Sequence, residues 1–236
     1  MNRVCLVTGG TRGIGLAVAD ALLAQGDRVA ITGTSTDGVA DAERRLAGGR
    51  AERSVLGVVC DVRDPASVER AVHDVVTRFG GLDVLVNNAG VGVGAPVADM
   101  TYDEWNRIIG TNLTGVFHCS KASIPHLRSR GGGWIINVSS LASKNPFVGA
   151  GAYCASKTGL NALSEVMMQE LRYDNIRVSY ILPGSVATEF AGRPAGTGGD
   201  WKLHAEDIAR AVVGLLEFPA RSLPSRIEIR PSRPSK

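Results

Sequence analysis

Short β-branched runs alternate with longer amphipathic segments along almost the whole chain. The predicted strands cover residues 3–8, 28–32, 55–62, 82–90, 133–140, 176–184 and 225–230, and the predicted helices between them cover residues 14–26, 37–48, 65–80, 101–130, 151–174 and 205–218. Parallel strands need long crossover connections, so strands separated by helices indicate a parallel sheet covered on both faces. The alternation therefore predicts an α/β fold with seven parallel strands in a doubly wound sheet and helices on both faces.

The composition fits a single domain spanning residues 1–236. Of these residues 44% are hydrophobic and 21% charged, and no linker or internal repeat divides the chain, so one large core can form. The four cysteines form no C-x-x-C pair, no secretory leader precedes the first apolar run, and no stretch approaches a membrane span. These features predict a cytoplasmic protein with reduced thiols and no membrane contact. The four histidines lack metal-ligand spacing, so no metal site is expected.

The formal net charge of +3 comes from a basic C-terminal tail. Residues 221–236 contain Arg221, Arg226, Arg230, Arg233 and Lys236 against the single acidic residue Glu228. No aromatic residues are interleaved with these charges, and no nucleic-acid recognition motif is present. A solvated tail is the better interpretation, and no nucleic-acid partner is expected.

The turn between the first predicted strand and helix reads TGGTRGIG and contains Gly9, Gly13 and Gly15. Glycines at such a turn let the backbone approach a pyrophosphate, and the following helix N-terminus offers unpaired N–H groups. A tight strand-to-helix turn favours glycine for steric reasons as well. Its position directly after the first strand favours dinucleotide binding.

The end of the second predicted strand favours NADP(H) over NAD(H). NAD-binding members of this fold usually place a carboxylate there, but here Thr34 and Ser35 follow the strand and the first carboxylate is Asp37. Hydroxyl groups can donate to a 2′-phosphate, and Arg12 in the glycine turn can reach the same phosphate. The alternative for Arg12 is a solvated loop arginine.

Two further loops carry polar residues at the ends of predicted strands. Asp61 follows the third strand and can accept a hydrogen bond from an adenine amino group. Asn87 and Asn88 follow the fourth strand, where a structural role in holding an irregular turn competes with ligand contact. Gly90 lets the chain pass close to a flat ribose or adenine.

The segment AYCASK places Tyr153 and Lys157 four residues apart. At helical spacing the two side chains share one face, and an ammonium beside a phenol favours the phenolate. We therefore expect Lys157 to lower the pKa of Tyr153 toward the working pH, as a general acid or base requires. The alternative is an exposed pair on an ordinary helix.

Together with Ser140 and the Pro183–Gly184 pair, the motifs TGGTRGIG, NNAG and Y-x-x-x-K resemble the classical short-chain dehydrogenase/reductase family. The resemblance extends from about residue 4 to residue 190, with the motifs in the family's order and spacing. It implies a Rossmann-like fold, a nicotinamide dinucleotide as cofactor, and a catalytic tetrad of Asn112, Ser140, Tyr153 and Lys157.

The resemblance also implies a role for each member of the tetrad. Ser140 would donate a hydrogen bond to a substrate carbonyl oxygen, and Tyr153 would protonate that oxygen. Lys157 would bind the nicotinamide ribose, and Asn112 would hold a water that resupplies the proton. Ser139 competes for the role of Ser140, but the spacing to Tyr153 and the strand alternation favour Ser140.

The cofactor-binding residues expected from these motifs and from the resemblance form one set. The resemblance implies that backbone groups of Val186 hold the carboxamide and that Thr188 contacts the carboxamide or the pyrophosphate. The full set is Gly9, Thr11, Arg12, Gly13, Ile14, Gly15, Thr34, Ser35, Asp61, Val62, Asn88, Ala89, Gly90, Tyr153, Lys157, Pro183, Gly184, Val186 and Thr188.

The expected function is NADPH-dependent reduction of a small-molecule ketone to a secondary alcohol, with a short lid at about residues 189–204 covering the substrate. The lid is rich in Gly, Pro and Ala, and its sequence does not indicate a particular substrate. A 3-oxoacyl-carrier-protein reductase is the main alternative. Arg128 and Arg130 could dock its acidic carrier, but Asp174 stands where a basic residue is expected. An NADP(H)-sensing regulator and an NAD-dependent alcohol dehydrogenase are further alternatives.

The resemblance also predicts the assembly. Family members commonly pair their fourth and fifth long helices, here residues 101–130 and 151–174, in a four-helix contact, so we expect a homotetramer, with a homodimer as the alternative. The second helix carries small and apolar residues over more of its surface than one buried stripe requires.

Overall fold

All seven strands join one parallel sheet in the order β3-β2-β1-β4-β5-β6-β7. The computed structural model describes residues 2–48, 54–92, 94–188 and 200–234. The strands are β1 (Val4–Val7), β2 (Arg28–Gly33), β3 (Val55–Val59), β4 (Val84–Asn87), β5 (Gly133–Val138), β6 (Ile176–Pro183) and β7 (Arg226–Ile229). The predicted doubly wound parallel sheet is confirmed.

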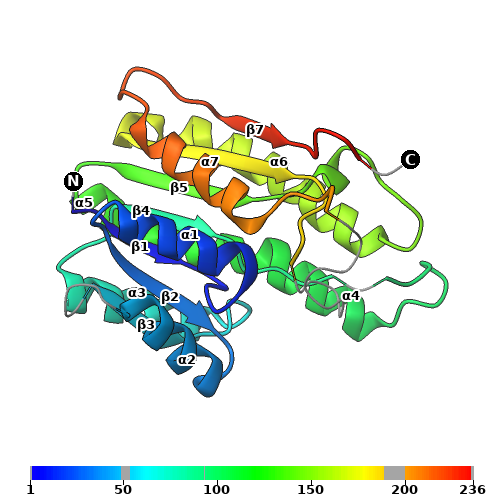
Figure 1. Cartoon of the computed structure of the whole chain (residues 1–236), viewed down its shortest axis with the longest axis horizontal. Helices are drawn as coiled ribbons and strands as arrows, with labels where there is room; N and C mark the ends of the chain where they lie inside the picture. The colour runs from blue at the N-terminus through cyan, green and yellow to red at the C-terminus, as the bar shows by residue number, and fades with distance from the viewer. Residues whose placement is uncertain (1, 49–53, 93, 189–199, 235–236) are drawn as a thin grey trace.

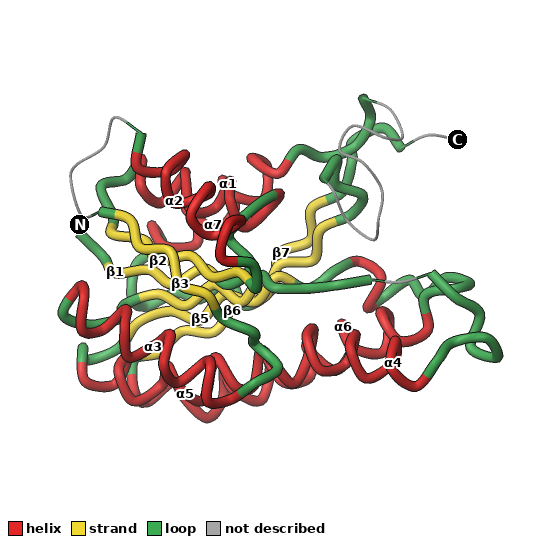
Figure 2. The backbone as a smooth tube through the Cα atoms, turned by 90° about the horizontal axis from the view of Figure 1, so that it is seen from below, coloured by secondary structure: helices red, strands yellow, loops and turns green. Residues whose placement is uncertain are grey.

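Helices cover both faces of the sheet. They are α1 (Gly13–Ala24), α2 (Thr36–Ala47), α3 (Pro65–Phe79), α4 (Tyr102–Ile109), α5 (Gly115–Ser129), α6 (Gly151–Leu171) and α7 (Ala205–Glu217). Figure 1 shows α1 and α7 lying side by side, and Figure 2 shows α1, α2 and α7 on one face with α3, α4, α5 and α6 on the other. Among the described residues, no helix is long and apolar enough to span a membrane.

The helix boundaries follow local capping chemistry. Thr101 caps α4 in a capping box with Glu104, and Asp64 caps α3, whose first residue is proline. Gly80 ends α3 in the left-handed conformation, with φ of 82°. Each cap satisfies backbone groups that the helix itself leaves unpaired.

The long helix predicted for residues 101–130 is not a single α-helix. A π-helical turn, η1 (Gly110–Thr114), separates α4 from α5. Two 3₁₀ turns complete the helical segments: η2 (Leu141–Ser143) follows β5, and η3 (Arg172–Asp174) extends α6. The π-helical turn carries the predicted catalytic residue Asn112, and irregular turns of this kind are frequent at functional sites.

Two hydrophobic cores lie on the two faces of the sheet. Within β4, Val84 and Val86 face the core under α1 and α7, whereas Leu85 faces the core beside α3 and α5. This alternation follows from the two-residue period of a strand, and both faces are apolar because helices cover both. The parallel strands bring the loops after β1, β2, β3, β4, β5 and β6 to one edge. The strand order reverses between β1 and β4, which is the usual ligand position in such sheets.

Candidate active site

Helix α6 places Tyr153 and Lys157 one turn apart on the same face. The Lys157 ammonium lies 6.0 Å from the centroid of the Tyr153 ring. Its Nζ donates a 2.7 Å hydrogen bond to the main-chain carbonyl of Val138, at the end of β5. Lys157 is only 4% exposed, and burial lowers the pKa of Lys157 to about 8. The pair is therefore not an exposed surface pair.

The pKa of Tyr153 differs from the prediction. Burial raises the pKa of Tyr153, and a hydrogen bond with Ser140 acts in the opposite direction. The prediction that Lys157 lowers the Tyr153 pKa is wrong for this structure. The ammonium is directed to the Val138 carbonyl, and desolvation of the phenol dominates.

The structure separates the two candidate serines. Ser139 is buried, and its hydroxyl donates to Asn161 Oδ1 at 2.6 Å and lies 3.4 Å from the carbonyl of Lys157. Ser140 caps η2 by accepting from the Ala142 N–H at 3.1 Å and is hydrogen-bonded to Tyr153. Of the two serines, Ser140 is therefore the one that is hydrogen-bonded to Tyr153.

Asn112 joins the loop after β4 to helix α6. Its Oδ1 accepts from the Val91 N–H at 2.8 Å, and its Nδ2 donates to the Val91 carbonyl at 2.9 Å and to Ser156 Oγ at 3.1 Å. A Cβ placed on Gly90 would lie 3.4 Å from Asn112 Oδ1 and 3.8 Å from Lys157 Nζ. The predicted residues Gly90, Asn112 and Lys157 therefore meet at one point.

The glycine turn after β1 depends on close backbone packing. Gly9 and Gly13 have positive φ values of 63° and 54°. A Cβ on Gly15 would lie 2.3 Å from the Gly9 carbonyl oxygen and 2.4 Å from Asn88 Nδ2. No side chain fits at position 15, so the glycine there has a steric cause within the protein itself.

The two asparagines after β4 are engaged in the fold. Asn88 Nδ2 donates to the carbonyls of Thr8 and Gly9, both at 3.0 Å, and so fixes the glycine turn. Asn87 Nδ2 donates to Asn137 Oδ1 at 2.8 Å and to Ser120 Oγ at 3.2 Å. Both side chains thus make contacts within the fold, and Asn88 also stays among the residues predicted to bind the cofactor. Ala89, the next residue, donates its N–H to Thr8 Oγ1 at 3.1 Å.

The residues expected around a 2′-phosphate lie near the end of β2. Ser35 caps α2 by accepting from the Gly38 N–H at 3.3 Å, and Thr34 beside it is exposed. A Cβ on Gly33 would lie 2.5 Å from Thr11 Cγ2, so the end of β2 adjoins the glycine turn. Arg12 occupies the N-cap position of α1 and is exposed.

The loop after β3 carries Asp61 and Val62. Arg63 donates to Asp61, with Nη2 2.6 Å from Oδ2, and this hydrogen bond lowers the pKa of Asp61. The carboxylate is thus ionised at neutral pH and can still accept from further donors. The Val62 carbonyl pairs with His118 Nδ1 at 3.0 Å. Ile14 packs against the core under α1.

The segment after β6 reaches back to the glycine turn. Leu203 pairs with this segment: the Ala187 N–H donates to the Leu203 carbonyl, and Val186 and Leu203 form an isolated parallel bridge. A Cβ on Gly13 would lie 3.4 Å from Thr188 Cβ, so Thr188 borders the turn. Pro183 ends β6, and Gly184 follows it. Residues 189–199 of the predicted lid lie outside the described residues.

Three exposed apolar side chains lie in the segments that flank the start of α6, and we define Val97, Phe147 and Val148 as the apolar rim. These side chains are 76%, 62% and 96% exposed, respectively. Ala95 pairs with Ala150 at the start of α6, and a Cβ on Gly151 would lie 3.1 Å from Val97 Cγ2. The rim segments therefore border the first turn of α6, which carries Tyr153.

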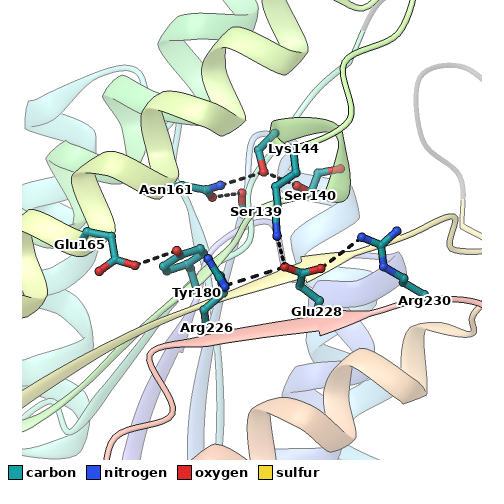
Figure 3. Close-up of polar contacts among 10 residues, drawn as sticks. Ser139, Ser140, Lys144, Asn161, Glu165, Tyr180, Arg226, Glu228 and Arg230 are labelled. Carbon is teal, nitrogen blue, oxygen red and sulfur yellow. Dashed lines mark hydrogen bonds and ion pairs between the residues drawn. The ribbon is translucent and has the colours of Figure 1, made fainter.

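Asn161 is a polar residue of this region that no sequence motif indicates. It lies one turn beyond Lys157 on α6 and contacts Ser139 (Figure 3). It also contacts Ser143. The signal that could have found it is the repeated four-residue spacing of Tyr153, Lys157 and Asn161 on one helix face.

Known proteins share this architecture. The family described as short chain dehydrogenase matches residues 3–195. The 3alpha-hydroxysteroid dehydrogenase of Mediterraneibacter gnavus is 35% identical over 188 residues, covering 80% of this chain and 75% of that protein. The 3-oxoacyl-(acyl-carrier-protein) reductase FabG of Haemophilus influenzae is 35% identical over 227 residues, covering 91% and 90%.

A solved structure matches over its full length. The alcohol dehydrogenase of the archaeon Thermococcus sibiricus, complexed with 5-hydroxy-NADP, superimposes with a TM-score of 0.92 at 30% sequence identity, covering 100% of both chains. The similarity thus includes proteins named for different substrates.

Proposed function

Because this chain belongs to the short-chain dehydrogenase family, we propose that this oxidoreductase uses NADPH to reduce an apolar ketone to a secondary alcohol. One observation carries the proposal. Tyr153 and Lys157 share one face of α6, and Tyr153 is hydrogen-bonded to Ser140 at the edge of the sheet where the loops after the strands gather. A phenol, a hydroxyl and an ammonium at one point can orient and protonate a carbonyl oxygen.

The loops at this edge fit a dinucleotide. The glycine turn lies directly before the N-terminus of α1, and Gly90 lies beside Lys157 without a side chain of its own. NADPH supplies the hydride when it is bound. Lys157 uses one of its three N–H donors on the Val138 carbonyl, so two remain for the ribose hydroxyls.

The preference for NADPH over NADH rests on the end of β2. No carboxylate lies between Gly33 and Thr36, so nothing there repels a 2′-phosphate. The Ser35 hydroxyl accepts from the Gly38 N–H and keeps its own hydrogen for donation. Arg12, in the adjoining glycine turn, supplies positive charge. The NADP analogue in the Thermococcus sibiricus structure supports this assignment.

The proposed proton transfer begins at Tyr153. Ser140 donates a hydrogen bond to the substrate carbonyl oxygen, and Tyr153 gives that oxygen its proton as the hydride reaches the carbonyl carbon. Burial keeps Tyr153 protonated, which suits an acid, and its hydrogen bond with Ser140 offsets part of that effect. Asn112 holds the Val91 backbone beside Lys157 and would place the water that resupplies the proton.

The rim favours an apolar ketone over an acyl group on a carrier protein. Val97, Phe147 and Val148 expose apolar surface in the segments that flank the start of α6, the helix that carries Tyr153, and exposed apolar surface near such a site favours an apolar ligand. The basic residues considered for carrier docking are engaged elsewhere. Arg128 pairs with Asp174 at 2.7 Å and Arg130 with Asp83 at 2.9 Å. Asp174 lies beyond the end of α6, whereas Tyr153 lies at its start.

We expect the proposed enzyme to act as a homotetramer. Trp105 on α4, Phe117 on α5 and Val166 on α6 are exposed, and these helices lie on the same outer face of the molecule (Figure 2). Pairing this face with a second copy would bury the three side chains.

A panel assay tests the proposed function. NADPH absorbance is followed with simple ketones, diketones, polycyclic ketones and 3-oxoacyl thioesters. Turnover of apolar ketones at rates above those of the thioesters supports the proposal. Preference for carrier-bound thioesters would favour the 3-oxoacyl-carrier-protein reductase, and no turnover of any carbonyl would favour an NADP(H) sensor. If the enzyme oxidises alcohols with NAD faster than it reduces ketones with NADPH, an NAD-dependent alcohol dehydrogenase would be favoured.

A further inference from the structure

The proposed catalytic serine lies in a short polar turn, which we define as the serine turn, residues 139–143. Ser140 caps η2 through its hydroxyl, which accepts from the Ala142 N–H at 3.1 Å. The Ser140 carbonyl accepts a 2.6 Å hydrogen bond from Ser143 Oγ. The orientation of the Ser140 hydroxyl therefore depends on the conformation of the whole turn, not on Ser140 alone.

Asn161 contacts the serine turn on both sides of Ser140, and Figure 3 shows its amide beside Ser139. Its Oδ1 accepts from Ser139 Oγ at 2.6 Å, and its Nδ2 donates to Ser143 Oγ at 2.8 Å. The Ser143 hydroxyl thus receives one hydrogen bond from Asn161 and passes one to the Ser140 carbonyl. A planar amide that accepts at one end and donates at the other holds both ends of the turn in one orientation.

The same helix face carries the rest of the proposed machinery. Tyr153, Lys157 and Asn161 follow one another at four-residue intervals on α6. The Ser139 oxygen also lies 3.4 Å from the Lys157 carbonyl, so the turn packs closely against this face. The contacts of Asn161 therefore connect the serine turn to the helix that carries the tyrosine and the lysine.

The residue that follows the serine turn is held by an ion pair and not by an amide. Lys144, directly after the turn, pairs with Glu228 on β7 at 2.5 Å, and Arg230 also pairs with Glu228 at 3.1 Å (Figure 3). The Lys144 and Glu228 side chains are 41% and 26% exposed, and ion pairs in contact with solvent contribute little and are screened by salt. The half-buried amide of Asn161 is the better candidate for fixing the turn.

We propose that Asn161 is a positioning residue that sets the Ser140 hydroxyl against Tyr153. The inference rests on the proposed function, because Ser140 and Tyr153 are the groups that act on the carbonyl there. Asn161 acts through Ser139 and Ser143, the two side chains that its amide contacts.

The kinetic test is a double-mutant cycle. Asn161→Ala should lower kcat for ketone reduction by on the order of 10- to 50-fold, because small displacements of a catalytic group are costly, while the NADPH dissociation constant stays within about 2-fold. In the Ser140→Ala background, the same substitution should change kcat by less than about 2-fold, since the group it positions is gone. Equal losses in both backgrounds would overturn the proposal.

A matched control on the same helix separates positioning from general stability. Ser164 lies on the next turn of α6 and accepts a 2.8 Å hydrogen bond from Asn137 Nδ2, without contacting the serine turn. Ser164→Ala should destabilise the protein and leave kcat within about 2-fold of the wild type. Ser143→Ala removes the other partner of Asn161 and should lower kcat in the same direction. A loss of kcat in Ser164→Ala equal to that in Asn161→Ala would contradict the positioning role.

Crystal structures of the variants provide a readout that needs no turnover. In Asn161→Ala the serine turn should be displaced relative to Tyr153, and in Ser164→Ala it should match the wild type. If the wild type reduces no ketone, the proposed function fails, and the crystal structures still decide the positioning inference. An unmoved turn in Asn161→Ala would overturn that inference even where the wild type is active.

Discussion

The ammonium of Lys157 donates a 2.7 Å hydrogen bond to the main-chain carbonyl of Val138. This contact ties helix α6 to the end of β5, directly before the serine turn. The group is buried, and its pKa falls from the ordinary value of 10.5 to about 8, so its charge depends on pH within an accessible range.

The first prediction follows from the depressed pKa of Lys157. Between pH 8 and 10.5, Lys157 is protonated in the unfolded chain and largely deprotonated in the folded protein. The contribution of Lys157 to the free energy of unfolding therefore rises with pH through that window. The free energy of unfolding of the wild type, relative to that of Lys157→Met, should rise by about 2 kcal/mol between pH 7 and pH 9.5. Urea denaturation of both proteins without added cofactor measures it. A constant difference would contradict the depressed pKa.

The second prediction concerns Gly15. Alanine there would place its Cβ 2.3 Å from the Gly9 carbonyl oxygen, so Gly15→Ala should destabilise the protein by about 1–3 kcal/mol and weaken NADPH binding. Gly214 is a matched control within α7, because a Cβ added there would meet no atom of the described residues within 4 Å outside its own helix turn. Gly214→Ala should stabilise by about 0.5–1 kcal/mol. Thermal unfolding distinguishes the two, and a neutral Gly15→Ala would refute the steric argument.

The third prediction concerns the cofactor phosphate. Arg12→Ala should weaken NADPH binding by about 10- to 150-fold, since a hydrogen bond between charged groups is worth about 1.5–3 kcal/mol, and should leave NADH nearly unchanged. Arg45→Ala removes the same charge from the exposed far end of α2 and should alter neither affinity. Fluorescence titration with NADPH and with NADH measures the dissociation constants of the wild type and both variants. Equal losses of affinity for NADPH and NADH in Arg12→Ala would mean that Arg12 does not bind the 2′-phosphate.

The fourth prediction concerns assembly. Light scattering at micromolar concentration should give a mass near four times 24.8 kDa. The double substitution Trp105→Glu with Phe117→Glu should reduce that mass, because the contact between copies would then have to bury unpaired carboxylates. Phe218→Glu makes the same change on an exposed side chain at the end of α7 and should leave the tetramer intact. A monomeric wild type would reject the predicted helix-to-helix contact.

Hydrophobic periodicity was sufficient to predict the sheet, because each strand and helix here carries its own local pattern. Val84, Leu85 and Val86 already show the continuous apolar run of a strand buried on both faces. The i, i+4 spacing that puts Tyr153 and Lys157 on one helix face is equally local. Ser140 was expected from the family resemblance, and strand alternation only favoured it over Ser139.

Contacts between distant segments account for what the sequence did not predict. The pKa of Tyr153 is raised because the phenol is buried, and that burial comes from segments far from Tyr153 in the sequence. The π-helical turn at Asn112 interrupts a segment that has an ordinary helical pattern. Asn161 became a candidate only when the structure placed it between Ser139 and Ser143.

The central claim is that Tyr153 is the acid in NADPH-dependent ketone reduction. The most direct measurement is kcat for the best ketone of the panel, with the wild type and Tyr153→Phe, beside the NADPH dissociation constant of each. The substitution deletes one oxygen and keeps the ring, which packs against Ala142 and Ala150. We expect unchanged NADPH binding and a loss of kcat on the order of 100-fold or more. A variant that binds NADPH normally and keeps more than about a tenth of the wild-type kcat would contradict the claim.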